Sequence, residues 1–149
     1  MILKPFDVIL CKGDKKLISK LICKITGAEY HHAEIYLGNY LIVDGMPNGV
    51  KIRPMDRSLG KFDAYRYKGE ITSEQEKLIE EYIQKRLNCK YNFKELILQL
   101  FNKQDKDKTK VICITLVTEA FQYAGIDVGE WQVGFGQICD NEIFAKVNN

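Results

Sequence analysis

Five cysteines and two histidines are the residues of this 149-residue chain best suited to covalent chemistry. The cysteine number is odd and no pair has Cys-x-x-Cys spacing, which argues against a disulfide framework and a zinc ribbon. Most free cysteines are small buried hydrophobes, so few of these are expected to react. Cys113 stands where a charged segment gives way to an apolar helical pattern, which predicts that it lies in the first turn of a helix. Such a position stabilises a thiolate, and the unpaired N–H groups there can bind an oxyanion.

A cysteine nucleophile also needs a proton acceptor and a group that orients the acceptor. His31 and His32 are adjacent at a strand entrance, which predicts that they point to opposite faces. If the hairpin turns at Gly38, Asp44 lies opposite His32 and can accept a hydrogen bond from its ring. Glu34 is the competing orienter, since residues i and i+2 share a strand face. No metal is expected at the histidines, because no Cys or His at ligand spacing joins them.

The elements that would position these residues follow from hydrophobic periodicity, turns and caps. Strands are expected at 8–10, 33–36, 40–43, 50–54 and 63–67, and helices at 15–25, 73–87, 93–101 and 111–124. Gly38-Asn39 predicts a hairpin turn, and Ser73 with Glu76 predicts a capping box. The helix at 93–101 carries one apolar stripe, 102–110 is a charged loop, and 127–149 has no clear pattern. The segregation of strands from helices predicts the α+β class, in one domain over 1–149.

The composition narrows the classes of partner. Hydrophobic residues make up 46% and charged residues 28%, an ordinary balance for a globular protein. The net charge of +2 is too small to predict a nucleic-acid partner. No apolar run approaches the ~18 residues of a membrane span, and the N-terminus lacks a signal-peptide pattern. We therefore expect no stable membrane insertion and a cytoplasmic location, and nothing in the sequence indicates an oligomeric state.

Two motifs resemble those of a known family. Residues 30–38, Tyr-His-His-Ala-Glu-Ile-Tyr-Leu-Gly, resemble the His motif of the circularly permuted papain-like hydrolases. This is the YiiX/YebB-like branch of the NlpC-type superfamily, which is related to lecithin:retinol acyltransferase. Residues 113–117 and 124–126 resemble its Cys motif, in which a helix that begins at Cys ends in a small residue and Gly. The resemblance spans roughly residues 4–128 in the family's order, with His first and Cys last.

The resemblance implies a small antiparallel sheet or barrel packed against a Cys-bearing helix and additional helices. It also implies that His32 pairs with a polar residue on the following strand, which favours Asp44 over Glu34. Three positions depart from the family pattern. Phe6 stands where the family has Gly before the first-strand Asp, Ile114 stands where it has Ser, and Asp44 stands where many relatives have Glu or His.

Chemistry and resemblance together predict a cysteine-dependent hydrolase or acyltransferase of amide or ester bonds. Cys113 would be the nucleophile, His32 the general base and Asp44 the orienter, with Glu34 as the alternative orienter and no cofactor or metal. The expected substrate is peptide-like, such as a cell-wall peptide, or a lipid acyl group. The alternative is a non-catalytic module on the same fold that binds an acyl chain or a protein, as the apolar residues beside Cys113 suggest.

Overall fold

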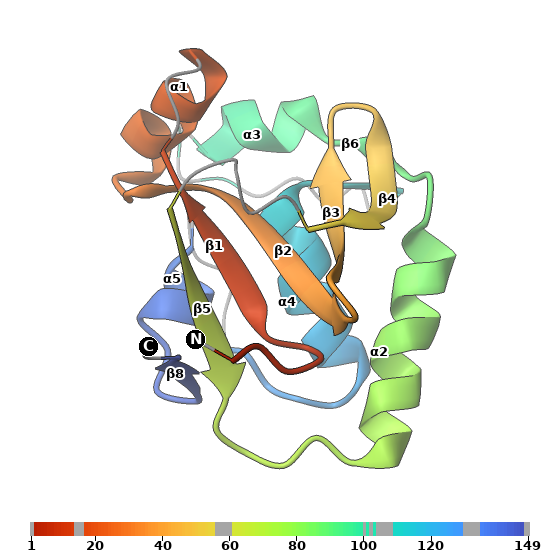
Figure 1. The fold of residues 1–149 in the computed structure, drawn as a ribbon. Coiled ribbons are helices and arrows are strands. Elements are labelled where there is room, and N and C mark those ends of the chain that lie inside the picture. Colours follow the sequence, from red (N-terminus) through yellow and green to blue (C-terminus); the bar gives the residue numbers. More distant parts are fainter. Residues whose placement is uncertain are drawn as a thin grey trace.

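A six-stranded antiparallel sheet forms the centre of the computed structural model, which describes residues 2–13, 17–55, 61–99, 101, 103, 109–129 and 135–147. Its strand order is β4-β3-β2-β1-β5-β8. The strands are β1 (Val8–Lys12), β2 (Tyr30–Gly38), β3 (Leu41–Met46), β4 (Gly49–Pro54), β5 (Phe62–Tyr67) and β8 (Phe144–Lys146). Figure 1 shows β1, β2 and β5 crossing the front of the molecule, with α4 behind β2.

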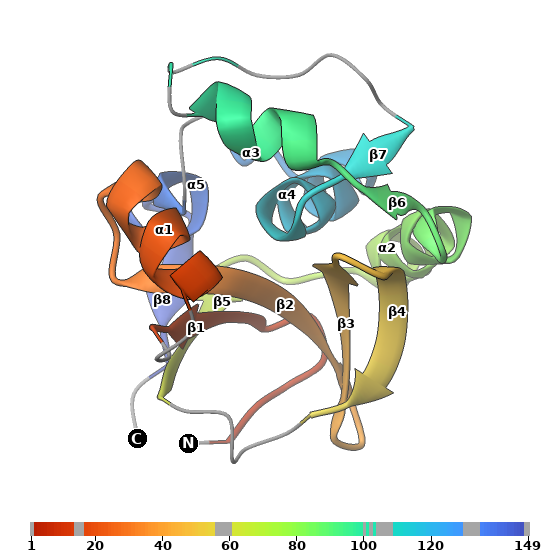
Figure 2. The same cartoon turned by 90° about the horizontal axis from the view of Figure 1, so that it is seen from above.

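Helices cover one face of this sheet and its β4 side (Figure 2). They are α1 (Leu17–Thr26), α2 (Ser73–Arg86), α3 (Phe93–Gln99), α4 (Cys113–Tyr123) and α5 (Gly136–Cys139). A short parallel pair, β6 (Lys90–Tyr91) with β7 (Lys110–Val111), leads the chain into α4. The expected α+β class with a small antiparallel sheet against a Cys-bearing helix is confirmed.

The hairpin between β2 and β3 sets the register of the site. Its two turn residues, Asn39 and Tyr40, have φ of 49° and 59°, as a two-residue turn with a left-handed backbone requires. Gly38 pairs with Leu41, three residues beyond the expected register, and an irregularity between Tyr36 and Gly38 takes back one residue, so Asp44 lies directly opposite Glu34. The expected pairing of Asp44 with His32 was therefore wrong by two residues, because the turn lies beyond Gly38.

A bulge at the other end of β2 changes where the histidines point. Cys11 pairs with His32 and Lys12 pairs with Tyr30, so His31 is an extra residue on this strand. The rings of His31 and His32 stack, with centroids 6.4 Å apart and an angle of 29° between their planes. The prediction that they point to opposite faces was wrong, because the bulge interrupts the alternation of side chains.

Alternate residues of the strands enter two separate apolar clusters. The larger cluster joins Ala33, Ile35 and Val43 to the buried face of α4. The apolar residues predicted for this helix face, Leu116, Val117, Ala120 and Phe121, are all fully buried. The smaller cluster lies on the other face of the sheet and is centred on Ile9, Tyr36 and Ile42. Because residues i and i+2 share a face, Glu34 and Asp44 lie on the side of the smaller cluster.

Several helix boundaries differ from the sequence prediction. The capping box of α2 is formed by Thr72 and Gln75, one residue before the expected Ser73 and Glu76. The stripe predicted for α3 is not buried as a whole, since Phe93 is 50% and Ile97 is 57% exposed. Most of the predicted charged loop lies outside the described residues. The C-terminal segment, which had no clear pattern, contains α5 and the sheet-edge strand β8.

Phe6 stands where the family that the sequence resembles has glycine, and it has the left-handed backbone that glycine adopts most easily. Its φ is +67°, an unusual value for an aromatic residue. Its N–H donates to the carbonyl of Tyr36 at 2.7 Å, and its side chain is buried. The next residue, buried Asp7, accepts two 2.7 Å hydrogen bonds from Arg66 on β5. These contacts hold the strained backbone at the entrance to β1.

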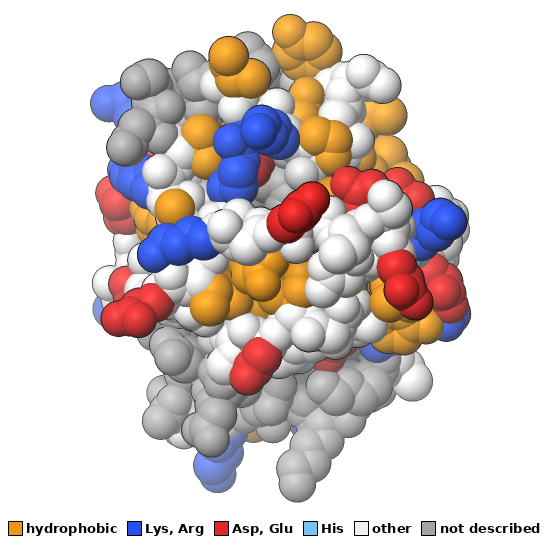
Figure 3. Space-filling model, turned by 90° about the horizontal axis from the view of Figure 1, so that it is seen from below, with side chains coloured by type: hydrophobic (Ala, Val, Ile, Leu, Met, Phe, Trp, Pro, Cys, Tyr) orange, Lys and Arg blue, Asp and Glu red, His pale blue; other side chains and the backbone are white. Residues whose placement is uncertain are grey.

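Basic and acidic side chains are interspersed around apolar ones on the face shown in Figure 3. This pattern agrees with the small net charge of +2. Within the described ranges, every helix is too short or not apolar enough to cross a membrane.

Candidate active site

Cys113 is the first residue of α4, as the sequence predicts. The preceding residue, Ile112, has no side chain that could cap the helix. Thr115 instead accepts a 3.0 Å hydrogen bond from the Ile112 N–H, and its hydroxyl donates back to the Ile112 carbonyl. The first N–H groups of an α-helix have no partner within the helix. They are therefore donors beside the Cys113 sulfur, where the positive end of the helix dipole favours negative charge.

Gly45 on β3 lies against this helix terminus. A Cβ atom at this position would stand 3.4 Å from the Cys113 nitrogen and 3.5 Å from its Cα. A methyl group would fit here in ordinary contact, whereas a larger side chain would press on the start of α4. Since Asp44 precedes Gly45, the same contact brings the carboxylate strand beside the thiol. Gly45 was not predicted from the sequence as part of the site.

His32 lies between Asp44 and Cys113. Its Nε2 is 2.9 Å from Oδ2 of Asp44. Cys113 is the second neighbour of the ring that favours its charged form. Burial lowers the pKa of His32, but the interactions with Asp44 and Cys113 outweigh burial and raise this pKa to about 10. The ring is therefore an imidazolium at neutral pH.

Arg53 on β4 holds the Asp44 carboxylate from a second side. Its Nη2 and Nε lie 2.6 Å and 3.1 Å from Asp44 Oδ2. Burial raises the pKa of Asp44, but hydrogen bonds from His32 and Arg53 outweigh burial, and this pKa lies below its ordinary value. Asp44 is therefore an anion that stabilises the charged form of His32. Arg53 was not predicted from the sequence, although its place on the strand after Asp44 was available as a signal.

Glu34 is the more distant of the two carboxylates. Its Oε1 lies 3.8 Å from His32 Nε2 and accepts a 2.8 Å hydrogen bond from Arg53. Burial raises the pKa of Glu34, and the positive charges of His32 and Arg53 oppose this effect without cancelling it. The structure thus brings all four predicted residues together, with Asp44 closer to the imidazole than Glu34.

Two other cysteines are poorly suited to act as nucleophiles. Cys11 pairs with His32 across the β1–β2 ladder, but burial and the charge of Glu34 raise the pKa of its thiol. Burial raises the pKa of Cys139 to about 11, and its sulfur donates to the Phe135 carbonyl. Both are therefore neutral thiols near neutral pH, and a neutral thiol is a weak nucleophile.

His32, Glu34 and Asp44 also have the chemistry of metal ligands, since one donor atom of each lies within 4.8 Å of the others. The arrangement with Arg53 in place does not fit a metal. A divalent ion about 4 Å from the guanidinium would be repelled by about 8 kcal/mol at an effective dielectric of about 20.

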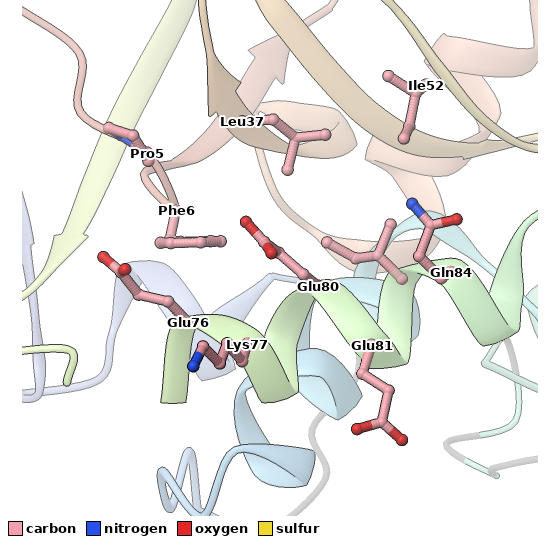
Figure 4. A pocket seen from close by; sticks show the side chains of 10 residues that line it. Pro5, Phe6, Leu37, Ile52, Glu76, Lys77, Glu80, Glu81 and Gln84 are labelled. Atoms are coloured by element: carbon pink, nitrogen blue, oxygen red, sulfur yellow. The ribbon is translucent and has the colours of Figure 1, made fainter. Parts of the chain in front are cut away.

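A separate cavity of about 570 Å³ lies between α2 and the loop that precedes β1 (Figure 4). Its apolar lining comes from Pro5, Phe6, Leu37, Ile52 and Ile83, and its polar lining from Glu76, Lys77, Glu80, Glu81 and Gln84. In Figure 4 Glu80 extends towards Phe6 and Leu37, whereas Glu81 points away from them. Neither Cys113 nor His32 lines this cavity.

The fold is similar to that of the metalloprotein yiiX from Escherichia coli O157:H7. The TM-score is 0.76 at 18% sequence identity, and the match covers 97% of this chain and 96% of that chain. No family model and no curated protein matches this sequence. At this identity the likeness establishes a YiiX-like fold and leaves the activity open. The YiiX-like fold implied by the two motifs is confirmed, and the papain-like relation stays a prediction.

Proposed function

We propose that this protein is a cysteine-dependent hydrolase or acyltransferase that cleaves amide or ester bonds through an acyl-enzyme on Cys113. The observation that carries the proposal is the position of His32, whose Nε2 lies 2.9 Å from Asp44 Oδ2 and whose ring is near enough to Cys113, the first residue of α4, for the thiol to raise its pKa. In this proposal Cys113 is the nucleophile, His32 the proton carrier and Asp44 the orienting anion of a catalytic triad.

In the acylation step, the Cys113 thiolate attacks the carbonyl carbon of the substrate and a carbon–sulfur bond forms. The carbonyl oxygen becomes an oxyanion, and the Cys113 N–H at the start of α4 stabilises it. The bond to the leaving group then breaks, and the His32 imidazolium gives its proton to the leaving amine or alkoxide. Asp44 remains ionised throughout and keeps the ring oriented.

In the second step, the neutral imidazole of His32 takes a proton from water or from another acceptor. The resulting nucleophile attacks the thioester carbonyl, the carbon–sulfur bond breaks, and the thiolate is restored. Water as the acceptor gives hydrolysis, and an amine or alcohol gives acyl transfer. A cell-wall peptide or other peptide-like amide and a lipid acyl group are the substrate classes that we propose.

Intact-mass spectrometry after incubation with peptidyl and acyl electrophiles tests the proposal. We expect one adduct on Cys113, formed fastest by the electrophile closest to the natural substrate. The adduct should be absent in Cys113→Ser and strongly slowed in His32→Ala, whereas Cys139→Ser serves as the matched control and should react normally. An adduct distributed over several cysteines, or one that forms equally fast without His32, would reject the activated nucleophile.

The structural neighbour yiiX is described as a metalloprotein, which raises the same possibility for this chain. In this chain, the possible metal ligands found among the described residues are His32, Glu34 and Asp44. The guanidinium of Arg53 on both carboxylates opposes a metal there. We therefore propose a metal-independent thiol mechanism.

The cavity beside α2 supports a second candidate function, a binding module for an apolar ligand. Its volume lies within the range of small-molecule sites, and its apolar lining could hold an acyl or alkyl chain. Glu76 and Glu80 on its wall favour a neutral or amine head group over a carboxylate. Calorimetry with dodecylamine and dodecanoate, on the wild type and Leu37→Glu, tests this function. Equal binding by both proteins would place the ligand elsewhere.

A further inference from the structure

Two adjacent strands, β2 and β3, carry a set of possible metal ligands, and the neighbouring strand β4 places a cationic side chain among them. His32 and Glu34 come from β2 and Asp44 from β3, and their donor atoms all lie within 4.8 Å of one another. Arg53, from β4, places Nη2 2.8 Å from Glu34 Oε1 and 2.6 Å from Asp44 Oδ2. The same nitrogen therefore bridges the two oxygens that a bound metal would need.

The two carboxylates that hold Arg53 are already desolvated. Asp44 is fully buried and Glu34 is 6% exposed, so neither carboxylate can turn to water without a local opening of the sheet. Asp44 Oδ1 is buried and has no hydrogen-bond partner within the described part of the chain. Two carboxylates and one imidazole form a set that suits zinc, manganese or ferrous iron. The Arg53 side chain is 30% exposed, so its removal would open a path from solvent.

We infer that Arg53 is the resident cation of the His32–Glu34–Asp44 cluster, that it excludes a divalent metal from these ligands, and that the cluster becomes a transition-metal site when the guanidinium is removed. Arg53 thereby acts as a positioning residue, because it keeps Asp44 ionised and fixed for His32. That positioning role rests on the proposed thiol function. The exclusion of metal does not, since it depends only on the three ligands and the guanidinium.

Zinc binding to Arg53→Leu tests this inference. The measurement is equilibrium dialysis against zinc chloride, followed by elemental analysis, in a Cys11→Ser/Cys113→Ala background. The two thiols near the cluster then cannot act as ligands, and the outcome is independent of the thiol mechanism. We expect Arg53→Leu to bind one zinc ion at least 10-fold more tightly than the Arg53 protein. Arg53→Lys is the matched control, because it keeps the positive charge and should bind no better than the Arg53 protein.

Addition of Asp44→Asn to Arg53→Leu should abolish the new site, and cobalt in place of zinc should give a spectrum without thiolate bands. If Arg53→Leu does not fold, as judged by circular dichroism, Arg53→Gln removes the charge and keeps a hydrogen-bond donor. Two results would overturn the inference. One is a zinc ion held by the Arg53 protein and lost in Asp44→Asn. The other is no gain in zinc affinity in either neutral variant.

Discussion

Asp44→Asn is the substitution that most directly tests how the imidazole is charged. The Asp44 carboxylate lies 2.9 Å from His32 Nε2. At an effective dielectric of about 20, this separation gives an attraction of about 6 kcal/mol. Arg53 lies 2.6 Å from the same oxygen and neutralises part of the charge, so about half of this value, roughly 3 kcal/mol, is left for His32. Since 1.36 kcal/mol is a tenfold effect, the variant should destabilise the imidazolium by about 100-fold.

Histidine NMR is the assay, because the chain has only two histidines and His31→Gln identifies the signals of His32. In a Cys113→Ala background, which removes the coupled thiol, Asp44→Asn should lower the pKa of His32 strongly. Glu34→Gln is the matched control, and its effect should be smaller because Glu34 Oε1 is 3.8 Å from Nε2. A pKa of His32 that stays unchanged in Asp44→Asn, or that falls further in Glu34→Gln, would refute the role given to Asp44.

Three other predictions test the surroundings of the site. Gly45→Val should slow the alkylation of Cys113 by iodoacetamide at least ~10-fold, because the larger side chain presses on the helix terminus. Gly45→Ala, whose Cβ would make an ordinary 3.4 Å contact, should change this rate little. Equal rates in all three proteins would contradict this prediction. Phe6→Gly relieves about 1–2 kcal/mol of backbone strain and loses about 3–5 kcal/mol of side-chain burial. Urea unfolding should therefore show that the free energy of unfolding falls by about 2 kcal/mol. A more stable variant would show that the strain dominates. The pKa of His32 is raised from 6.5 to about 10, so its stabilising contribution is complete below pH 6.5 and is lost as the pH rises to 10. Wild type should therefore lose more unfolding free energy over this range than His32→Gln, and parallel curves would disprove the linkage.

The elements with strong local signals were predictable from the sequence. The apolar face of α4, including Leu116 and Phe121, follows from helical periodicity, and it is buried as predicted. The start of α4 at Cys113 follows from the change from charged to apolar residues. In contrast, α5 and β8 are short and depend on tertiary contacts, such as the pairing of Tyr67 with Phe144. Local patterns carry little information about such contacts.

The details of the site were less predictable, because they depend on register. The bulge at His31 comes from a mismatch between β1 and β2 that neither strand shows alone. The position of Arg53 depends on the β3–β4 register, in which Asp44 pairs with Lys51 and Arg53 pairs with Ile42. Arg53 is thus diagonal to Asp44 on a shared face, a relation that becomes visible only when both strands are aligned.

The same relation explains why an incorrect register still led to a contact between His32 and Asp44. Asp44 lies directly opposite Glu34 and is diagonal to His32, and long side chains reach across such a diagonal. Glu34, two residues from His32 on the same strand face, would compete equally as the partner of His32 only if the two carboxylates had equal surroundings. They do not, since Arg53 donates two hydrogen bonds to Asp44 and one to Glu34, and the pKa values of the two acids move in opposite directions. Two carboxylates whose environments separate their pKa values take different roles. In the proposed mechanism, the choice of orienter is therefore made by β4, through Arg53, and not by the hairpin that carries both acids.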